Sequence, residues 1–253
     1  MQDQHVPAIT RLYWPAFAAA TLFGSNAGDL LVGPLRQWGM AWLYLPLLTV
    51  VFIAILYVEA RDQSPSLRWY WLAVILAPTA ANQLADLSFA YLGVRRIWVC
   101  AGLLVLLVVA HLAFQSDTTR LIALRLQQRP RPTVPLTDAT YWIAMVVAST
   151  AGNLASDFLT LGRSLDIRAV CVMLAVPLLA AAALRRWTDF NRTWTYWSVV
   201  VTVNALGTAV GDLLADDSQY GVGLARSVVL SGAILVVVLF LASPAREGVA
   251  RTR

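Results

Sequence analysis

Residues 141–157 read YWIAMVVASTAGNLASD, an apolar segment that opens on two aromatic rings and closes on small residues, an amide and a carboxylate. The Tyr-Trp pair occurs at four places in the chain, and an aspartate follows each tryptophan at a spacing of fifteen residues. The other copies are YWPAFAAATLFGSNAGD at 13–29, YWLAVILAPTAANQLAD at 70–86 and YWSVVVTVNALGTAVGD at 196–212. One spacing kept in four copies indicates an internal repeat.

A second apolar run follows each copy. These runs cover residues 38–58, 97–114, 169–184 and 224–242. A bilayer core of about 30 Å requires about 20 helical residues, so we expect each run to cross the membrane once. The runs are continuously apolar and lack the alternation of a barrel strand. The sequence therefore predicts an all-α, polytopic membrane protein with eight transmembrane helices, arranged as four pseudo-symmetric helical hairpins.

The predicted organisation is a single membrane domain over residues 1–253, with repeats at about 11–60, 68–115, 139–186 and 194–243. Residues 116–138 contain the proline-rich stretch RPRPTVP and are predicted to be a cytoplasmic linker between two halves. Each repeat is expected to cross the membrane twice, so consecutive repeats enter it in the same direction. The pseudo-symmetry axis should then run along the membrane normal.

Composition supports a lipid environment. Hydrophobic residues make up 59% of the chain and charged residues 13%. A soluble domain has about 25% charged residues. All 19 basic residues are arginines, and they lie at the ends of apolar runs, where they fix orientation and do not indicate nucleic-acid binding. With the N-terminus inside, 13 of the 19 fall in cytoplasmic segments. We therefore expect a multi-pass membrane protein with both termini cytoplasmic and the lipid bilayer as its main partner.

The start of the chain, MQDQHVPAITRLYW, lacks the basic and apolar regions of a signal peptide, so the first apolar run is expected to remain as a membrane helix. The sequence leaves the oligomeric state open.

The repeat resembles a family of bacterial membrane proteins built from four tandem copies of a two-helix repeat of unknown function. The resemblance rests on the Tyr-Trp pair and on a GxTxxD-type ending. Thr150-Ala151-Gly152 with Asp157 and Gly207-Thr208 with Asp212 are closest to that ending. The second repeat departs from it, with Ala80-Ala81 where a glycine is expected. The resemblance covers nearly the whole chain and implies the eight-helix fold and a location in the bacterial inner membrane, but it implies no particular activity.

The four aspartates are the candidate site residues: Asp29, Asp86, Asp157 and Asp212. A carboxylate inside a membrane helix costs roughly 2.5–3.5 kcal/mol at the helix centre, so its presence points to function. Polar residues on the same helix face form a seam toward each aspartate, and we expect the four seams to meet at a common centre. The supporting residues of this seam are Ser25, Asn26, Asn82, Thr150, Asn153 and Thr208.

Clustered carboxylates repel one another, and a divalent cation relieves that repulsion through oxygen ligands. The leading hypothesis is therefore a transport or ion-binding protein, in its most specific form a secondary transporter for manganese or magnesium with the four aspartates as metal ligands. The alternative is a structural or regulatory membrane protein whose aspartates make interhelical hydrogen bonds or salt bridges. No nucleophile–base pair, nucleotide motif or zinc motif is present, so we expect no enzymatic activity and no certain cofactor.

Overall fold

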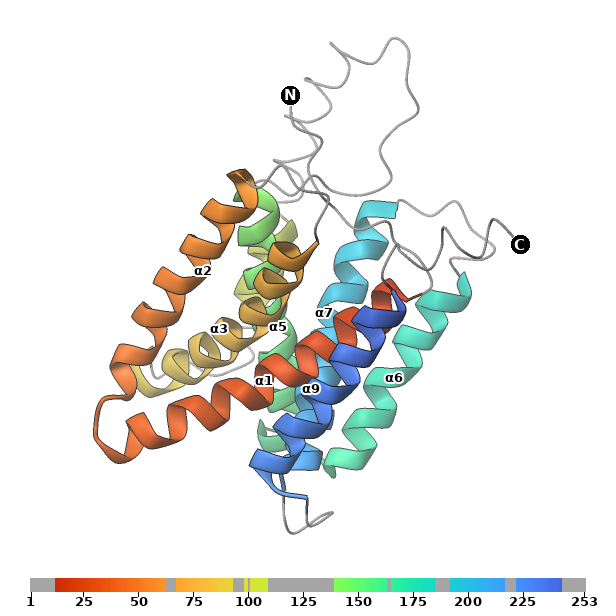
Figure 1. Cartoon of the computed structure of the whole chain (residues 1–253). Coiled ribbons are helices and arrows are strands. Elements are labelled where there is room, and N and C mark those ends of the chain that lie inside the picture. The colour runs from red at the N-terminus through yellow and green to blue at the C-terminus, as the bar shows by residue number, and fades with distance from the viewer. Residues whose placement is uncertain are drawn as a thin grey trace.

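The computed structural model describes residues 12–61, 67–92, 98–99, 101–108, 139–162, 165–184, 192–216 and 222–242. Within these ranges all regular secondary structure is helical (Figure 1). The predicted linker at 116–138 lies outside the described residues.

The four repeat copies form the central helices of the molecule. They lie in α1 (Tyr13–Gln37), α3 (Arg68–Leu92), α5 (Ala139–Asp157) and α7 (Arg192–Ala215). Helix α1 packs on α3, α3 on α5, α5 on α7, and α7 on α1 again. The repeat copies therefore build a closed ring of helices, which we call the helix ring, and a short π-helical segment (Phe158–Gly162) extends α5 at its end.

The second helix of a repeat packs mainly against the ring helix of the next repeat. Helix α2 (Tyr44–Arg61), which follows the 3-10 turn Ala41–Leu43, lies on α3, and α6 (Ile167–Leu184) lies on α7. In the second repeat, Val99 and Leu103 pack in one apolar cluster with residues of α3 and α5. Helix α9 (Leu224–Leu241) of the last repeat lies on α1 of the first, so the outer layer also closes on itself.

Close helix crossings in the ring depend on one small residue per repeat, five positions before each aspartate: Gly24, Ala81, Gly152 and Gly207. A Cβ atom added to Gly152 would lie 2.5 Å from the Val201 carbonyl oxygen, and one added to Gly24 would collide with the Ile75 carbonyl oxygen. Backbones approach this closely only where the side chain is absent or very small. At the first crossing Thr79 also donates a hydrogen bond of 2.8 Å to the Gly24 carbonyl oxygen.

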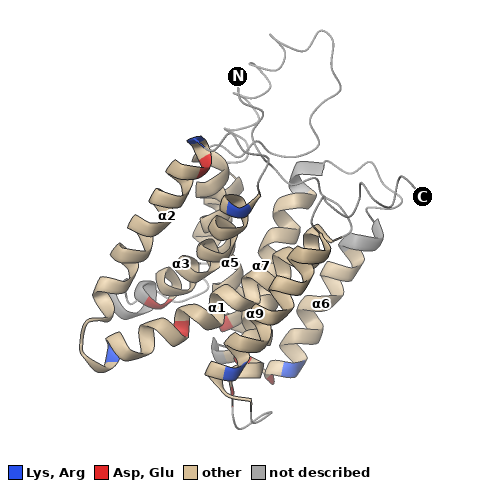
Figure 2. Cartoon of the chain, in the orientation of Figure 1, with Lys and Arg blue, Asp and Glu red and all other residues tan. Residues whose placement is uncertain are grey.

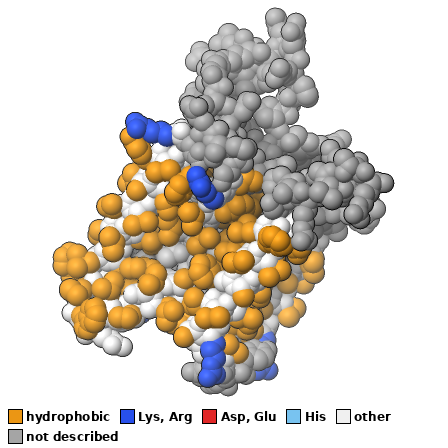
Figure 3. Space-filling view, in the orientation of Figure 1, with side chains coloured by type: hydrophobic (Ala, Val, Ile, Leu, Met, Phe, Trp, Pro, Cys, Tyr) orange, Lys and Arg blue, Asp and Glu red, His pale blue; other side chains and the backbone are white. Residues whose placement is uncertain are grey.

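The outer surface is apolar. Hydrophobic side chains cover most of the helical face seen in Figure 3, and Val50, Val229 and Val236 are 64%, 73% and 67% exposed. Among the described residues, four helices are long and apolar enough to cross a membrane: Ala41–Arg61, Ala139–Thr160, Thr195–Ala215 and Leu224–Leu241. Charged residues are sparse along the helices; the described arginines lie near helix ends, and acidic residues also lie further inside, as in α1 (Figure 2). These features indicate a membrane-embedded protein, in agreement with the all-α prediction.

Candidate functional site

One end of the helix ring holds the four repeat tyrosines in a cyclic hydrogen-bond network. The hydroxyl of Tyr13 lies 2.7 Å from that of Tyr70 and 2.9 Å from that of Tyr196, while Tyr141 lies 3.0 Å from Tyr70 and 2.7 Å from Tyr196. All four side chains are buried. Each hydroxyl therefore donates one hydrogen bond and accepts another, and we call this network the tyrosine ring.

The repeat tryptophans pack around the tyrosine ring in the same cyclic order. Each tryptophan lies against the tyrosine of the preceding repeat, and the first tryptophan lies against the last tyrosine. The ring centroids are 5.8 Å apart for Trp71 and Tyr13, 5.7 Å for Trp142 and Tyr70, 5.7 Å for Trp197 and Tyr141, and 5.5 Å for Trp14 and Tyr196. The aromatic residues thus join neighbouring repeats through aromatic packing as well as through hydrogen bonds.

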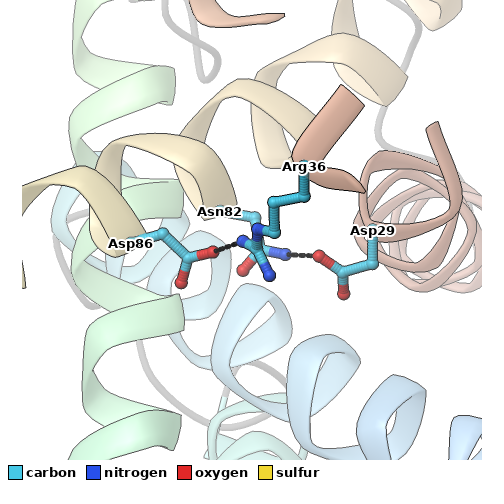
Figure 4. Close-up of polar contacts among 4 residues, drawn as sticks. All are labelled: Asp29, Arg36, Asn82 and Asp86. Atoms are coloured by element: carbon cyan, nitrogen blue, oxygen red, sulfur yellow. Dashed lines mark hydrogen bonds and ion pairs between the residues drawn. The ribbon is translucent and has the colours of Figure 1, made fainter. Parts of the chain in front are cut away.

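The aspartates follow the tyrosines by sixteen residues and gather toward the opposite end of the helix ring, which we call the acidic end. Asn82 donates a hydrogen bond of 2.9 Å to Asp29, and Arg36 pairs with Asp86 at 2.7 Å. Figure 4 shows Arg36 and Asn82 between the two carboxylates, so both connect α1 to α3. Asp157 is half-buried at the end of α5.

The four carboxylates share one electrostatic environment. Asp212 experiences the charges of Asp157, Asp29 and Asp86, and Asp29 experiences those of Asp86, Asp157 and Arg36. These four aspartates and Arg36, taken by themselves, carry a formal charge of −3 when all five are ionised. The acidic end is therefore a place where a positive charge is favoured.

The predicted polar seam divides into contacts between pairs of helices. Thr208 and Asn153 are hydrogen-bonded at 2.8 Å between α7 and α5, and Asn26 donates to Ser227 between α1 and α9. Thr150 donates to the Val146 carbonyl oxygen of its own helix at 2.8 Å. The seam residues thus stabilise helix packing at several interfaces.

Several buried polar atoms near the aspartates have no hydrogen-bond partner within the described part of the chain. They include Ser25 Oγ, Asn26 Oδ1, Gln83 Nε2 and Ser156 Oγ. Each belongs to a residue within four positions of an aspartate, which is about 6 Å along a helix. An unmet buried polar atom costs about 1–3 kcal/mol, so each of these atoms favours a polar partner. The Gln83 nitrogen can donate to water, whereas the three oxygens can bind water or a cation.

Tyr44 is a further residue of the acidic end. Its side chain is 5% exposed at the start of α2, its hydroxyl is unpaired among the described residues, and it interacts electrostatically with Asp29. Tyr44 lies outside the Tyr-Trp repeat, so the repeat pattern gave no signal for it.

The metal-site prediction places all four aspartates around one ion. In the parts of the chain that the structure describes, no group of three or more His, Cys, Asp or Glu side chains is close enough to hold a metal ion. Two of the carboxylates are held in separate contacts, Asp29 with Asn82 and Asp86 with Arg36. Coordination by all four therefore stays a prediction.

The repeat pattern did not predict that the repeat tyrosines pack inward. A signal for it exists in the sequence. Each repeat tyrosine precedes the small residue of the helix crossing by eleven positions, as in Tyr13 and Gly24 or Tyr141 and Gly152. Eleven residues are close to three full helical turns, so the two residues share one helix face. The crossing residue faces a neighbouring helix, and the tyrosine therefore does so as well.

These features define a class: an all-helical, membrane-embedded protein whose core is built from an internal repeat with an acidic end. Residues 195–246 match the family described as "Repeat of Unknown Function (DUF347)", which supports the predicted resemblance to an uncharacterised repeat-containing family. Comparison with curated proteins and comparison with solved structures give no significant match. The match covers the fourth repeat, including Tyr196 of the tyrosine ring and Asp212 of the acidic end.

Proposed function

We propose that the protein binds a small divalent cation, manganese or magnesium, at the acidic end of the helix ring. The observation that carries this proposal is the placement of Asp29 and Asp86 on facing helices, with Arg36 and Asn82 between them (Figure 4), at the end of the ring that also holds the other two repeat aspartates. Manganese and magnesium prefer oxygen ligands, and carboxylates together with hydroxyl and amide groups supply them. The unpaired buried polar atoms of Ser25 and Tyr44, among the described residues, add neutral oxygen atoms to this end of the ring.

Binding in this proposal includes a rearrangement. Asp29 is held by Asn82, and Asp86 is held by Arg36, so the carboxylates begin in separate contacts. A divalent ion attracts two or more of them at once and exchanges those contacts for metal–oxygen contacts. The exchange draws α1, α3 and their neighbours closer at the acidic end. Movement of ring helices on binding is what a transporter requires, so we further propose secondary transport of the bound cation.

The proposal includes the finer membrane arrangement. It places eight spans as four hairpins, both termini on the cytoplasmic side, and the protein in a bacterial inner membrane. The arginine distribution supports this orientation. The acidic end then faces away from the cytoplasm, and the tyrosine ring lies at the cytoplasmic end.

Binding is tested by thermal unfolding of the purified protein in detergent, with and without Mn²⁺ or Mg²⁺. A ligand at about one hundred times its Kd stabilises the folded state by about 2.7 kcal/mol, so the melting temperature should rise with the metal concentration. Asp212→Asn should abolish this rise. Glu59→Gln removes one negative charge from α2 and is the matched control, which should keep it. A wild-type protein indifferent to both ions, or an Asp212→Asn variant with an undiminished rise, contradicts the proposed site.

Transport is tested by Mn²⁺ uptake into proteoliposomes. Uptake should vanish in Asp86→Asn and Asp157→Asn and persist in Glu59→Gln. Asparagine keeps the size of aspartate and one acceptor oxygen, but it replaces the second oxygen with an NH2 donor and removes the charge. If both aspartate variants transport like the wild type, the carboxylates act only through hydrogen bonds and the transport proposal is wrong.

A further inference from the structure

The tyrosine ring has no role in the proposed cation site, yet it occupies the helix ring at the end opposite to the carboxylates. Its four hydroxyl oxygens are joined along every edge, at 2.7, 3.0, 2.7 and 2.9 Å. Oxygen atoms in hydrogen-bond contact are already at their closest normal approach. Four such atoms in one cycle leave no opening between them for a water molecule or a hydrated cation.

An apolar layer lies one helical turn from the tyrosine ring. Four positions after each tyrosine, on the same helix face, stand Phe17, Val74, Met145 and Val200, and all four side chains are 0% exposed. They belong to the same apolar cluster as the tyrosines, and the ring of Phe17 stacks on Tyr13 at a centroid distance of 6.3 Å. These side chains offer no ligand to an ion, and apolar constrictions of this kind exclude ions by excluding water.

We infer that the tyrosine ring and the apolar layer together seal the centre of the helix ring, so that cations reach the carboxylates from the acidic end alone. This inference rests on the proposed function, because it concerns access to the same site. A cation that crosses through the centre must first open at least two hydrogen bonds of the tyrosine ring and part the apolar layer. The protein then works as a carrier with a closed gate, and an open pore is excluded in this state.

The test measures passive entry of Mn²⁺ and of Na⁺ into proteoliposomes loaded with an ion-sensitive dye. The Phe17→Ala/Met145→Ala double variant empties two positions of the apolar layer, and Tyr13→Phe removes the hydroxyl that bonds both Tyr70 and Tyr196. We expect cation entry to rise by about tenfold in Tyr13→Phe, the factor that corresponds to the loss of one or two hydrogen bonds. It should rise further in the triple variant that combines Tyr13→Phe with the two alanine substitutions.

Two control variants match these changes outside the seal. Tyr57→Phe removes a hydroxyl from an exposed tyrosine of α2, and Val236→Ala shortens an exposed side chain of α9. Both should leave the vesicles as tight as those with the wild-type protein. Folding is checked by size-exclusion chromatography and circular dichroism.

If Tyr13→Phe and the Phe17→Ala/Met145→Ala double variant fold and still admit cations at the wild-type rate, the inference is overturned. If the alanine variants do not fold, Tyr13→Phe decides the matter, since it differs from the wild type by one oxygen atom. The metal-dependent melting temperature, measured on the same proteins, separates the two proposals. If variants of the tyrosine ring and the apolar layer admit no more cation than the wild type, while Mn²⁺ still raises the melting temperature, only the seal is contradicted. If these variants admit more cation but Mn²⁺ does not raise the melting temperature of the wild type, only the cation site is contradicted.

Discussion

The two ends of the helix ring are made by the same four helices but differ in how their polar groups are matched. At the tyrosine end every repeat contributes the same residue, and each hydroxyl is bonded to both neighbours. At the acidic end every repeat again contributes the same residue, but the contacts differ. Asp29 is bonded to Asn82, Asp86 is paired with Arg36, and nearby atoms such as Ser25 Oγ are unmatched among the described residues.

This difference separates packing from function. A neutral, fully matched ring stabilises the folded state and has nothing left to bind. A group of like charges with unmatched polar neighbours destabilises the folded state until a partner arrives. Substitutions at the two ends should therefore change the free energy of unfolding in opposite directions. Removal of a tyrosine hydroxyl should lower it, and removal of a carboxylate should raise it.

The largest effect is expected at the crossing that both ends depend on. Gly152→Ala places a methyl group 2.5 Å from the Val201 carbonyl oxygen and 2.9 Å from the Ala205 backbone nitrogen, and backbone atoms cannot move aside cheaply. The free energy of unfolding should fall by about 3 kcal/mol or more, as overpacking of a tight interface predicts. Gly33→Ala, with no atom within 4 Å, is the control and should not destabilise the protein. Denaturant titration in detergent measures both, and equal stabilities would contradict the close crossing.

The tyrosine end should be destabilised by every removal of a hydroxyl. Tyr13→Phe and Tyr70→Phe each remove two hydrogen bonds, for an expected loss of about 1–3 kcal/mol per variant. The adjacent double variant removes three bonds in total, because the two residues share one. Its loss should be smaller than the sum of the single losses. The opposite pair, Tyr13→Phe with Tyr141→Phe, shares no bond and should be additive. Additivity in both pairs would show that the ring is not a connected cycle.

The acidic end should respond in the other direction. Asp212→Asn removes one of four carboxylates that act on one another. In the absence of divalent cations the unfolding free energy should therefore rise by about 1 kcal/mol. Glu59→Gln, distant from the cluster in the chain, is expected to change it much less. A destabilised Asp212→Asn protein would mean that the acidic end contributes to folding as the tyrosine end does.

The smallest effect is expected for the pair of Arg36 and Asp86. Their side chains are 58% and 44% exposed. Ion pairs this open to solvent contribute about 0–1 kcal/mol. Arg36→Ala should therefore leave the unfolding free energy nearly unchanged, while it strengthens Mn²⁺ binding by releasing Asp86. The melting temperature without metal reports the stability, and its rise with Mn²⁺ concentration reports the binding. Weaker Mn²⁺ binding in Arg36→Ala would show that Arg36 supports the site.

The sequence predicted the repeat, the helical class and the membrane environment, because these depend on spacing and hydropathy alone. It also placed the aspartates toward one end, since the distance along a helix follows from the residue count. The direction in which a side chain points around its helix, and the residue that it contacts, were harder to predict. Arg36 and Ser227 lie outside the repeated motif, and their contacts with Asp86 and Asn26 depend on how neighbouring helices cross. The inward direction of Tyr13 requires the eleven-residue spacing to Gly24, which becomes informative only once Gly24 is known to face a helix.

The packing of α9 on α1 has a consequence for biosynthesis. Translation proceeds at about 5–20 residues per second, so on the order of tens of seconds pass between the emergence of α1 and that of α9. During that interval α1 is already made while the surface that will cover it does not exist. The molecule is therefore complete only when the last repeat docks on the first, and the newborn chain must keep its first helix available until then.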